Sequence, residues 1–344
     1  LAGSGTTFRL AGGTTSGSIS TPDLVLYSGT ITLGNIFKGG ATFIYTAGTV
    51  NASSSTLTLS GTVTLSLGSS VVFSASSFGY GGTYTFNDDL WVAGSINLAG
   101  ASHVSTYISS TNKNIYCYGL TGTSGNNDPT GTNASRPNLI FNGTGTWSYT
   151  GSFGLNIIIN TAGTLTITGN KTIGSTNVSS NLTYTTGTIS FSGTPTLTNL
   201  GGNTLNVSGV TWPSVTLGNS NRTTTLTSDL NITGLLTITT ANIVYNGSNI
   251  NLNGDLTITS TGSITGTTNI VLNGNGTWTQ SSQPSSFTLP VVINTSGTIV
   301  ISGTITKNEN LTYTTGTVVV TGSILNWSGT MTINAPGFNL NTLN

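Results

Sequence analysis

The sequence predicts an all-β chain folded as a parallel β-helix (β-solenoid), built from tandem repeats and containing little or no helix. First, segments recur about 130 to 140 residues apart: residues 181–188 (NLTYTTGT) return almost unchanged at 310–317. Second, stretches such as 164–168 (TLTIT) alternate threonine with aliphatic residues, which places the two kinds on opposite faces of a strand. Third, Gly-Thr, Asn-Gly and Ser-Gly pairs separate these stretches and supply turn positions.

Two further matches support the repeat. The hexapeptide NGTGTW at 142–147 returns as NGNGTW at 273–278, and residues 83–99 align without a gap with residues 223–239. Self-similarity at a fixed spacing is the signature of a repeat architecture. It divides the chain into a first unit at 1–140, a second at 141–272 and a partial third at 273–344.

Shorter spacings predict the coil inside each unit. Strand cues of the type Asp/Asn-Leu-x-Ile/Val recur at Asp229, Asp255, Asn181 and Asn310. Several of the spacings indicate a coil of about 25 residues, within the range of solenoid repeats. This fits coils of three short strands stacked about 4.8 Å apart, roughly 14 in all. Leu, Ile and Val would fill the interior, with Thr, Ser and Asn outside. A row of antiparallel β-sandwiches of about 130 residues each is the competing fold.

Residues 121–137 depart most from the repeat and are rich in Gly, Asn, Ser and Pro. This composition predicts an inserted surface loop in the first unit. The chain starts at Leu1 without Met, which we interpret as a processed mature chain or a piece of a longer one.

Composition excludes several classes of partner. The 344 residues include 7 basic and 7 acidic side chains, so only 4% are charged and the net charge is zero. A typical globular protein has about 25% charged residues. Without a basic patch we expect no nucleic-acid partner. No apolar run approaches the roughly 18 to 20 residues of a membrane helix, so we expect no membrane insertion. Cys117 is alone, which excludes an intrachain disulfide and favours a small core residue.

Three segments carry a resemblance: TLTITGN at 164–170, NLTYTTGTI at 181–189 and DLTITSTGSITG at 255–266. They resemble the Gly/Thr/Ser/Asn-rich repeats of secreted bacterial β-solenoid proteins, such as autotransporter passengers, filamentous adhesins and extracellular fibre proteins. The resemblance covers nearly the whole chain but is one of composition and period. It implies an extracellular or cell-surface location and an elongated, non-catalytic part.

The chain has few residues of the kinds that catalysis or metal binding requires. Asp88 and Asp89 are the only acidic pair, and paired carboxylates can cleave glycosidic bonds. However, Asp89 aligns with Asp229 in a slot that elsewhere holds Asn, which favours a side-chain-to-backbone hydrogen bond. His103 is the only histidine, with no second His and no nearby Cys to join it. We therefore expect no enzyme activity, no catalytic residue, no cofactor and no metal.

The aromatic residues divide into two kinds. Trp147 and Trp278 share one repeat position, so we expect core fillers. Trp91 aligns with Asn231 and is not a repeat feature, which makes it the candidate glycan-contact aromatic on the surface. Thr-x-Thr arrays such as Thr237/Thr239 would suit an ice-binding face, but they also arise whenever Thr fills the outside of a solenoid.

Asn-x-Ser/Thr matches are expected by chance in a chain this rich in Ser and Thr, and they mark candidate glycosylation acceptors. Glycans would keep so uncharged a surface soluble. The candidates singled out are Asn142, Asn181, Asn231, Asn310 and Asn326.

We expect a structural subunit or segment of an extracellular filament or surface fibre. A coil without a neighbour leaves backbone groups unpaired, which invites a second copy to stack head to tail into an open homo-polymer. The alternative is an adhesin stalk or phage-type tail fibre that binds host cell-surface glycans through its side faces or the 121–137 loop. A polysaccharide-cleaving enzyme is disfavoured, because it requires Asp88, Asp89 and His103 to line one groove.

Overall fold

The computed structural model describes residues 8–10, 13–19, 23–79, 82–98, 106–109, 113–122, 136–174, 179–200, 202–218, 222–239, 242–307, 310–321, 325–327 and 330–333. It is a parallel β-solenoid of about 13 turns. Within these residues there is no α-helix, and Gly68–Ser70 forms the one short 3-10 turn. All the strand pairs described are parallel, for example Leu236–Ile238 with Leu256–Ile258, so the prediction of a β-helix is confirmed and antiparallel sandwiches are excluded.

The contacts divide the chain into two compact units, which are described separately. Unit 1 comprises Leu1–Lys171 with Thr185–Gly193, and unit 2 comprises Thr172–Tyr184 with Thr194–Asn344. These units are defined by contacts, so the three sequence repeats at 1–140, 141–272 and 273–344 remain a prediction.

The strands of unit 1 are β1 (Phe8–Leu10), β2 (Gly13–Ile19), β3 (Leu24–Leu26), β4 (Thr30–Gly39), β5 (Thr42–Tyr45), β6 (Thr49–Asn51), β7 (Thr56–Ser60), β8 (Thr62–Ser66), β9 (Val72–Phe73), β10 (Ala75–Phe78), β11 (Thr83–Phe86), β12 (Leu90–Val92), β13 (Ser95–Leu98), β14 (Thr106–Ser109), β15 (Asn114–Cys117), β16 (Gly119–Gly122), β17 (Asn138–Phe141), β18 (Gly145–Trp147), β19 (Ser152–Phe153) and β20 (Ile157–Thr168). Strands β21 (Lys171–Ile173) and β22 (Leu182–Ser192) contain residues of both units.

The strands of unit 2 are β23 (Thr196–Asn199), β24 (Thr204–Asn206), β25 (Thr211–Trp212), β26 (Ser214–Leu217), β27 (Arg222–Leu226), β28 (Leu230–Ile232), β29 (Leu236–Ile238), β30 (Ile243–Gly247), β31 (Ile250–Leu252), β32 (Leu256–Ile258), β33 (Ser263–Gly266), β34 (Ile270–Leu272), β35 (Gly276–Gln280), β36 (Ser286–Phe287), β37 (Val291–Ser302), β38 (Ile305–Lys307), β39 (Leu311–Thr321), β40 (Leu325–Trp327) and β41 (Met331–Ile333).

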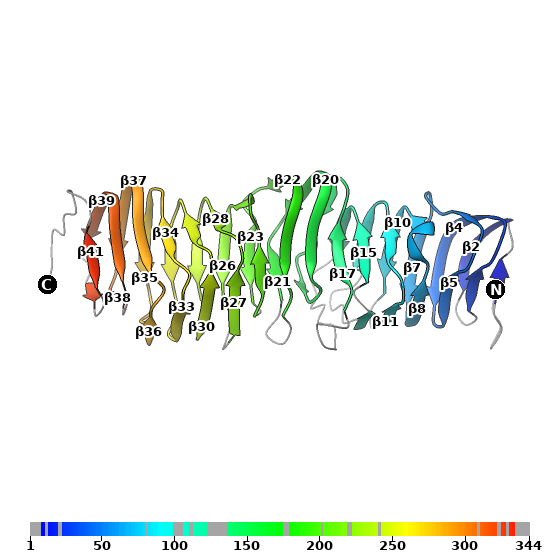
Figure 1. Cartoon of the computed structure of the whole chain (residues 1–344), viewed down its shortest axis with the longest axis horizontal. Helices are drawn as coiled ribbons and strands as arrows, with labels where there is room; N and C mark the ends of the chain where they lie inside the picture. The colour runs from blue at the N-terminus through cyan, green and yellow to red at the C-terminus, as the bar shows by residue number, and fades with distance from the viewer. Residues whose placement is uncertain are drawn as a thin grey trace. The chain divides into compact units, whose positions relative to one another are not determined.

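One coil contains three strands, as the sequence predicted. In unit 2 most strands pair in parallel with the strand three places later, so β27, β30, β33 and β36 lie side by side (Figure 1). Asn231 lies opposite Asn251, which is 20 positions later in the chain, so this coil is shorter than expected.

In unit 1 the coil around Trp91 has the expected length. Trp91 lies opposite Tyr116, and the hydrogen-bonded pair Asp89 and Asn114 beside them is 25 positions apart. Coil length therefore varies, because the turns between strands differ in length while the paired strands stay in register.

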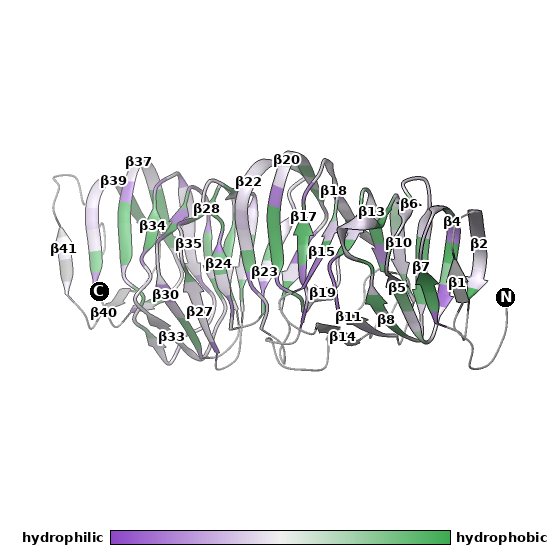
Figure 2. Ribbon diagram, turned by 45° about the vertical axis from the view of Figure 1, so that its right-hand side comes forward, coloured by the Kyte–Doolittle hydropathy of each residue, from purple (hydrophilic) through white to green (hydrophobic). Residues whose placement is uncertain are grey.

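The interior of the described coils is mainly apolar. In β28 the side chains of Leu230 and Ile232 are fully buried while Asn231 between them is partly exposed. Figure 2 shows this alternation as hydrophobic and hydrophilic segments along strands such as β37. The inward residues continue from coil to coil in a column of unit 2 made by Leu230, Ile250, Ile270, Val291 and Leu311. Each coil thus covers the apolar rung of its neighbour, as in other solenoids.

The recurring marker Tyr-Thr-Thr-Gly has a packing reason. In unit 2, Gly316 has φ +117°, and a Cβ added there would lie 2.6 Å from Cγ2 and 2.8 Å from the carbonyl oxygen of Thr295. Thr295 is buried and accepts a hydrogen bond from the N–H of Gly297 at 2.9 Å. The same arrangement holds in unit 1, where Gly187 lies against Thr161. Only glycine fits at this place in either copy.

Candidate functional site

The strongest candidate site surrounds Trp91 on the outer face of unit 1. Strand β12 buries Leu90 and Val92 at 1% and 2% exposure, so Trp91 between them points outward. In the neighbouring coils Trp91 pairs with Val72 on one side and with Tyr116 on the other. Strand pairing therefore places the indole between a short side chain and an aromatic ring.

The rings of Trp91 and Tyr116 are stacked, with centroids 3.8 Å apart and planes 12° from parallel. Their backbones are neighbours in the ladder, so this contact follows from the coil spacing of about 4.8 Å. Burial raises the pKa of the Tyr116 phenol, the negative charge of Asp89 raises it further, and a hydrogen bond with Asn114 opposes both. The stack fixes one face of the indole against the ring of Tyr116.

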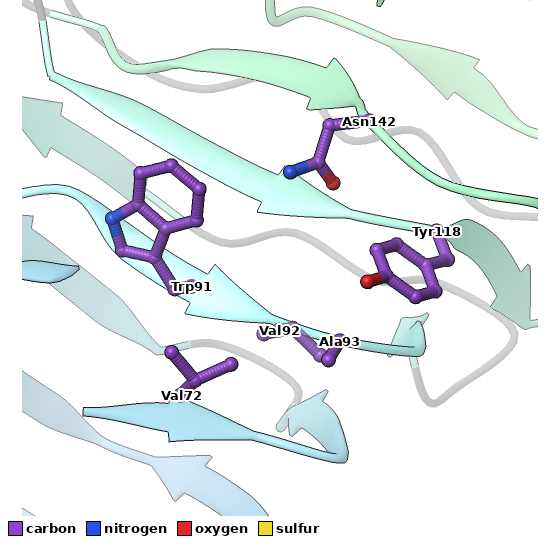
Figure 3. Close-up of a pocket in the computed structure, with 6 residues that line it drawn as sticks. All are labelled: Val72, Trp91, Val92, Ala93, Tyr118 and Asn142. Carbon is purple, nitrogen blue, oxygen red and sulfur yellow. The ribbon is translucent and has the colours of Figure 1, made fainter. Parts of the chain in front are cut away.

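A pocket of about 130 Å³ opens next to the indole. Figure 3 shows Val72, Val92 and Ala93 along one side of it, with Tyr118 and Asn142 opposite the ring of Trp91. None of these six lining residues is charged. The pocket is thus a small, neutral, half-open hollow with aromatic walls.

Two polar atoms of the pocket residues are buried without a hydrogen-bond partner among the described residues: Nε1 of Trp91 and Oδ1 of Asn142. The nitrogen lies on the side of the indole that faces away from Tyr118 (Figure 3). The oxygen belongs to the side chain that faces the pocket. Unsatisfied buried polar atoms are rare in folded proteins, so each of these two atoms needs a hydrogen-bond partner from outside the described residues.

Glycine shapes the opposite wall. A Cβ added at Gly143 would overlap the ring of Tyr118, so that ring lies directly over the backbone of residue 143. The N–H of Asn142 donates to the carbonyl of Cys117 at 2.9 Å, which fixes the backbone directly after β17 that carries the amide. Cys117 itself is fully buried, as expected from the sequence, and burial raises the pKa of its thiol.

The pocket is not a repeat feature. The equivalent slot in β28 holds Asn231, whose Oδ1 accepts a hydrogen bond from Nδ2 of Asn251 at 2.9 Å. An amide ladder thus replaces the aromatic stack in unit 2. This agrees with the prediction that Trp91 departs from the repeat.

The two members of the acidic pair have separate contacts in the next coil. Asp89 accepts the backbone N–H of Asn114 in the next coil at 2.8 Å, and Asp88 lies 3.8 Å from Nζ of Lys113. The side-chain-to-backbone hydrogen bond predicted for the Asp/Asn slot is therefore confirmed at Asp89. Three other aspartates accept an N–H about one coil later in the same way: Asp23 from Thr42, Asp229 from Asn249 and Asp255 from Thr277.

His103 and most of the predicted 121–137 loop lie outside the described residues, so the groove of Asp88, Asp89 and His103 is not tested. Among the residues that the structure does describe, no three His, Cys, Asp or Glu side chains are grouped as a metal site would require. The described part of the chain also has no helix that is long and apolar enough to span a membrane.

Trp147 and Trp278 are core residues, as predicted, each 1% exposed. The Thr-x-Thr arrays also form as expected. Successive strands of unit 2 place five threonines in one outward column: Thr198, Thr216, Thr237, Thr257 and Thr279.

The candidate glycosylation acceptors occupy different environments. Oδ1 of Asn181 accepts the N–H of Thr204 at 2.9 Å, while Asn310 is exposed. Asn142 and Asn231 have the contacts given above, and Asn326 lies in β40. Modification of these residues remains a prediction.

Three buried lysines were not anticipated from the sequence: Lys38, Lys171 and Lys307, each 0% exposed. Nζ of Lys171 donates to the carbonyls of Thr168 at 2.6 Å and Tyr149 at 2.9 Å, and burial lowers its pKa to about 8. Nζ of Lys307 donates to the carbonyl of Leu289, and that of Lys38 to Gly40. These amines satisfy interior backbone carbonyls, which makes them structural.

Sequence reasoning found Trp91 but missed Tyr116, Tyr118 and Asn142 as its neighbours. A signal was present: in the segment Ile115-Tyr116-Cys117-Tyr118, an alternation of period two predicts both tyrosines on the outer face. What the sequence lacked was the register that sets Trp91 against Tyr116.

No protein-family model, curated protein or solved structure matches the chain.

Proposed function

We propose that this chain is a structural segment of an extracellular filament or surface fibre, in which copies associate head to tail. The observation that carries the proposal is that hydrogen bonds join successive coils in both units, and that an apolar column runs through successive coils of unit 2. The aspartates are part of these links, since those at positions 23, 89, 229 and 255 each bond to a backbone N–H in a neighbouring coil. Carboxylates held in such hydrogen bonds stabilise the contacts between coils, and this role supports a structural function.

The same geometry supports the proposal of head-to-tail association. A parallel ladder is satisfied only where another strand lies alongside, so a coil with an open edge favours a second copy in the same register. Repetition of such a contact without closure gives an open fibre. A chain with only 4% charged residues offers little electrostatic repulsion between copies.

Negative-stain electron microscopy and light scattering across a hundredfold range of protein concentration test this proposal. We expect particles whose length grows with concentration while their width stays constant. Particles of one length and one mass at every concentration would contradict head-to-tail assembly.

A second function, recognition of cell-surface glycans, is favoured by one observation: the neutral aromatic pocket at Trp91. Binding sites for small ligands are mostly apolar hollows with a few placed polar groups, and this pocket has that character. Screening the intact chain against immobilised neutral and acidic glycans tests this function. The absence of any bound glycan would contradict it.

A further inference from the structure

The Trp91 pocket presents a specific combination of groups. One wall is the indole that Tyr116 holds by stacking, with centroids 3.8 Å apart. The other wall is the ring of Tyr118, and Asn142 adds an amide whose Oδ1 has no partner among the described residues. The floor consists of Val72, Val92 and Ala93.

We propose that this pocket binds one neutral pyranose ring at the end of an uncharged glycan, an inference that rests on the second proposed function. The apolar C–H groups of the sugar would pack against Trp91 and Tyr118. A sugar hydroxyl would bond to the amide of Asn142.

The polar groups match a hydroxyl-bearing ligand. An amide both donates and accepts, and so does each sugar hydroxyl, which allows one hydroxyl to engage Asn142 and another the phenol of Tyr118. Figure 3 shows the Asn142 amide and the Tyr118 hydroxyl on the same side of the pocket. Oδ1 of Asn142 is covered in the free chain, so a small rotation of the amide within the pocket would expose this atom to a sugar hydroxyl.

The charge and the size of the pocket restrict the class of ligand that it can bind. No lining residue is charged, so an anionic sugar would lose its hydration without gaining an ion pair. Pockets for larger ligands measure about 300–1,000 Å³. The 130 Å³ here accommodates a single ring, with the rest of a glycan outside.

The chain provides matched variants. Trp91→Asn introduces the residue that occupies the equivalent slot of β28, where the coil folds with Asn231. Asn142→Ala removes the amide and keeps the backbone N–H that donates to Cys117. Tyr27→Ala is the control, since it removes an aromatic that is 48% exposed, lies between β3 and β4 and does not line the pocket.

The intact chain and the three variants are titrated with the methyl glycosides of glucose, galactose, mannose and N-acetylglucosamine, and with that of N-acetylneuraminic acid as the anionic comparator. Calorimetry gives the affinity. The chain has four other tryptophans, Trp147, Trp212, Trp278 and Trp327, so only a fluorescence change that Trp91→Asn abolishes is assigned to Trp91. Circular dichroism verifies folding of each variant. If Trp91→Asn does not fold, Asn142→Ala still tests the site.

We expect at least one neutral glycoside to bind, with affinity lowered about tenfold or more by Trp91→Asn, lowered by Asn142→Ala and unchanged by Tyr27→Ala. Wild-type binding to glycans that neither pocket variant weakens would overturn this site and leave the second function standing. Binding of the anionic sugar alone would overturn the ligand class. No binding to any glycan by the intact chain would overturn both.

Discussion

The indole of Trp91 stacks on the phenol ring of Tyr116 in the following coil, with ring centroids 3.8 Å apart and planes inclined by 12°. The two residues belong to successive coils and lie directly opposite in the ladder. The contact therefore links two coils of unit 1 on their outer face and positions one wall of the pocket.

The stack should contribute coupling energy to the stability of unit 1. Aromatic pairs add about 0.5–1.5 kcal/mol beyond their buried area. A double-mutant cycle with Trp91→Asn and Tyr116→Thr, followed by urea denaturation, should give a coupling free energy of that size. Additive effects of the two substitutions would show that the rings touch without stabilising one another.

The aspartate slot should tolerate an amide but not a methyl group. Asp89→Asn keeps an oxygen for the N–H of Asn114, whereas Asp89→Ala leaves that N–H without its acceptor. We expect the alanine variant to lose about 1–2 kcal/mol of unfolding free energy, and the asparagine variant to lose clearly less. Chemical denaturation of both variants measures the difference. Equal losses would mean that the carboxylate charge, and not the hydrogen bond, matters.

Lys171 should make stability depend on pH. Its pKa is about 8 in the folded chain, against 10.5 for the free side chain. Between these values the unfolded chain holds a proton that the folded chain lacks, so unfolding free energy rises with pH through this window and levels off below about 8.

The comparison with Lys171→Met isolates this contribution. Between pH 7.5 and 9.5 the wild type should gain about 1–2 kcal/mol relative to the variant, measured by urea denaturation at each pH. The variant also leaves the carbonyls of Tyr149 and Thr168 without this donor, so only the change with pH is diagnostic. Parallel curves for the two proteins would show that Lys171 is not desolvated as the structure indicates.

Gly316 should resist substitution more strongly than Gly193, a glycine of positive φ with open space around it. An added Cβ meets Thr295 at 2.6 Å, whereas at Gly193, with φ +79°, nothing lies within 4 Å. Gly193→Ala should cost about 1 kcal/mol from backbone strain alone, and Gly316→Ala about 1–3 kcal/mol more from the clash. Thermal denaturation compares them. Equal losses of stability in the two variants would show that the recurring glycine is required only for its positive φ.

Some features were predictable from the sequence because they depend on local patterns. Alternation at 164–168 predicted that Leu165 and Ile167 face inward, and both are buried. The shared slot of Asp89 and Asp229 identified a hydrogen-bonding position. The burial of Trp147 and Trp278 followed from their position in the repeat. The buried lysines were not predictable, because no pattern shows that a cation near a strand end turns inward toward free carbonyls.

The sequence by itself determined that this protein is a coil of short parallel strands with an aliphatic interior, because period-two alternation and turn residues act within a few positions. Only the tertiary structure decided which residues become neighbours across coils. Partners in successive coils are 20 positions apart at Asn231 and Asn251 but 25 positions apart at Asp89 and Asn114. The register that joins Trp91 to Tyr116 is therefore set by the turns and ladders between them. The pocket depends on that register, so it could be identified only in the tertiary structure and not in the sequence.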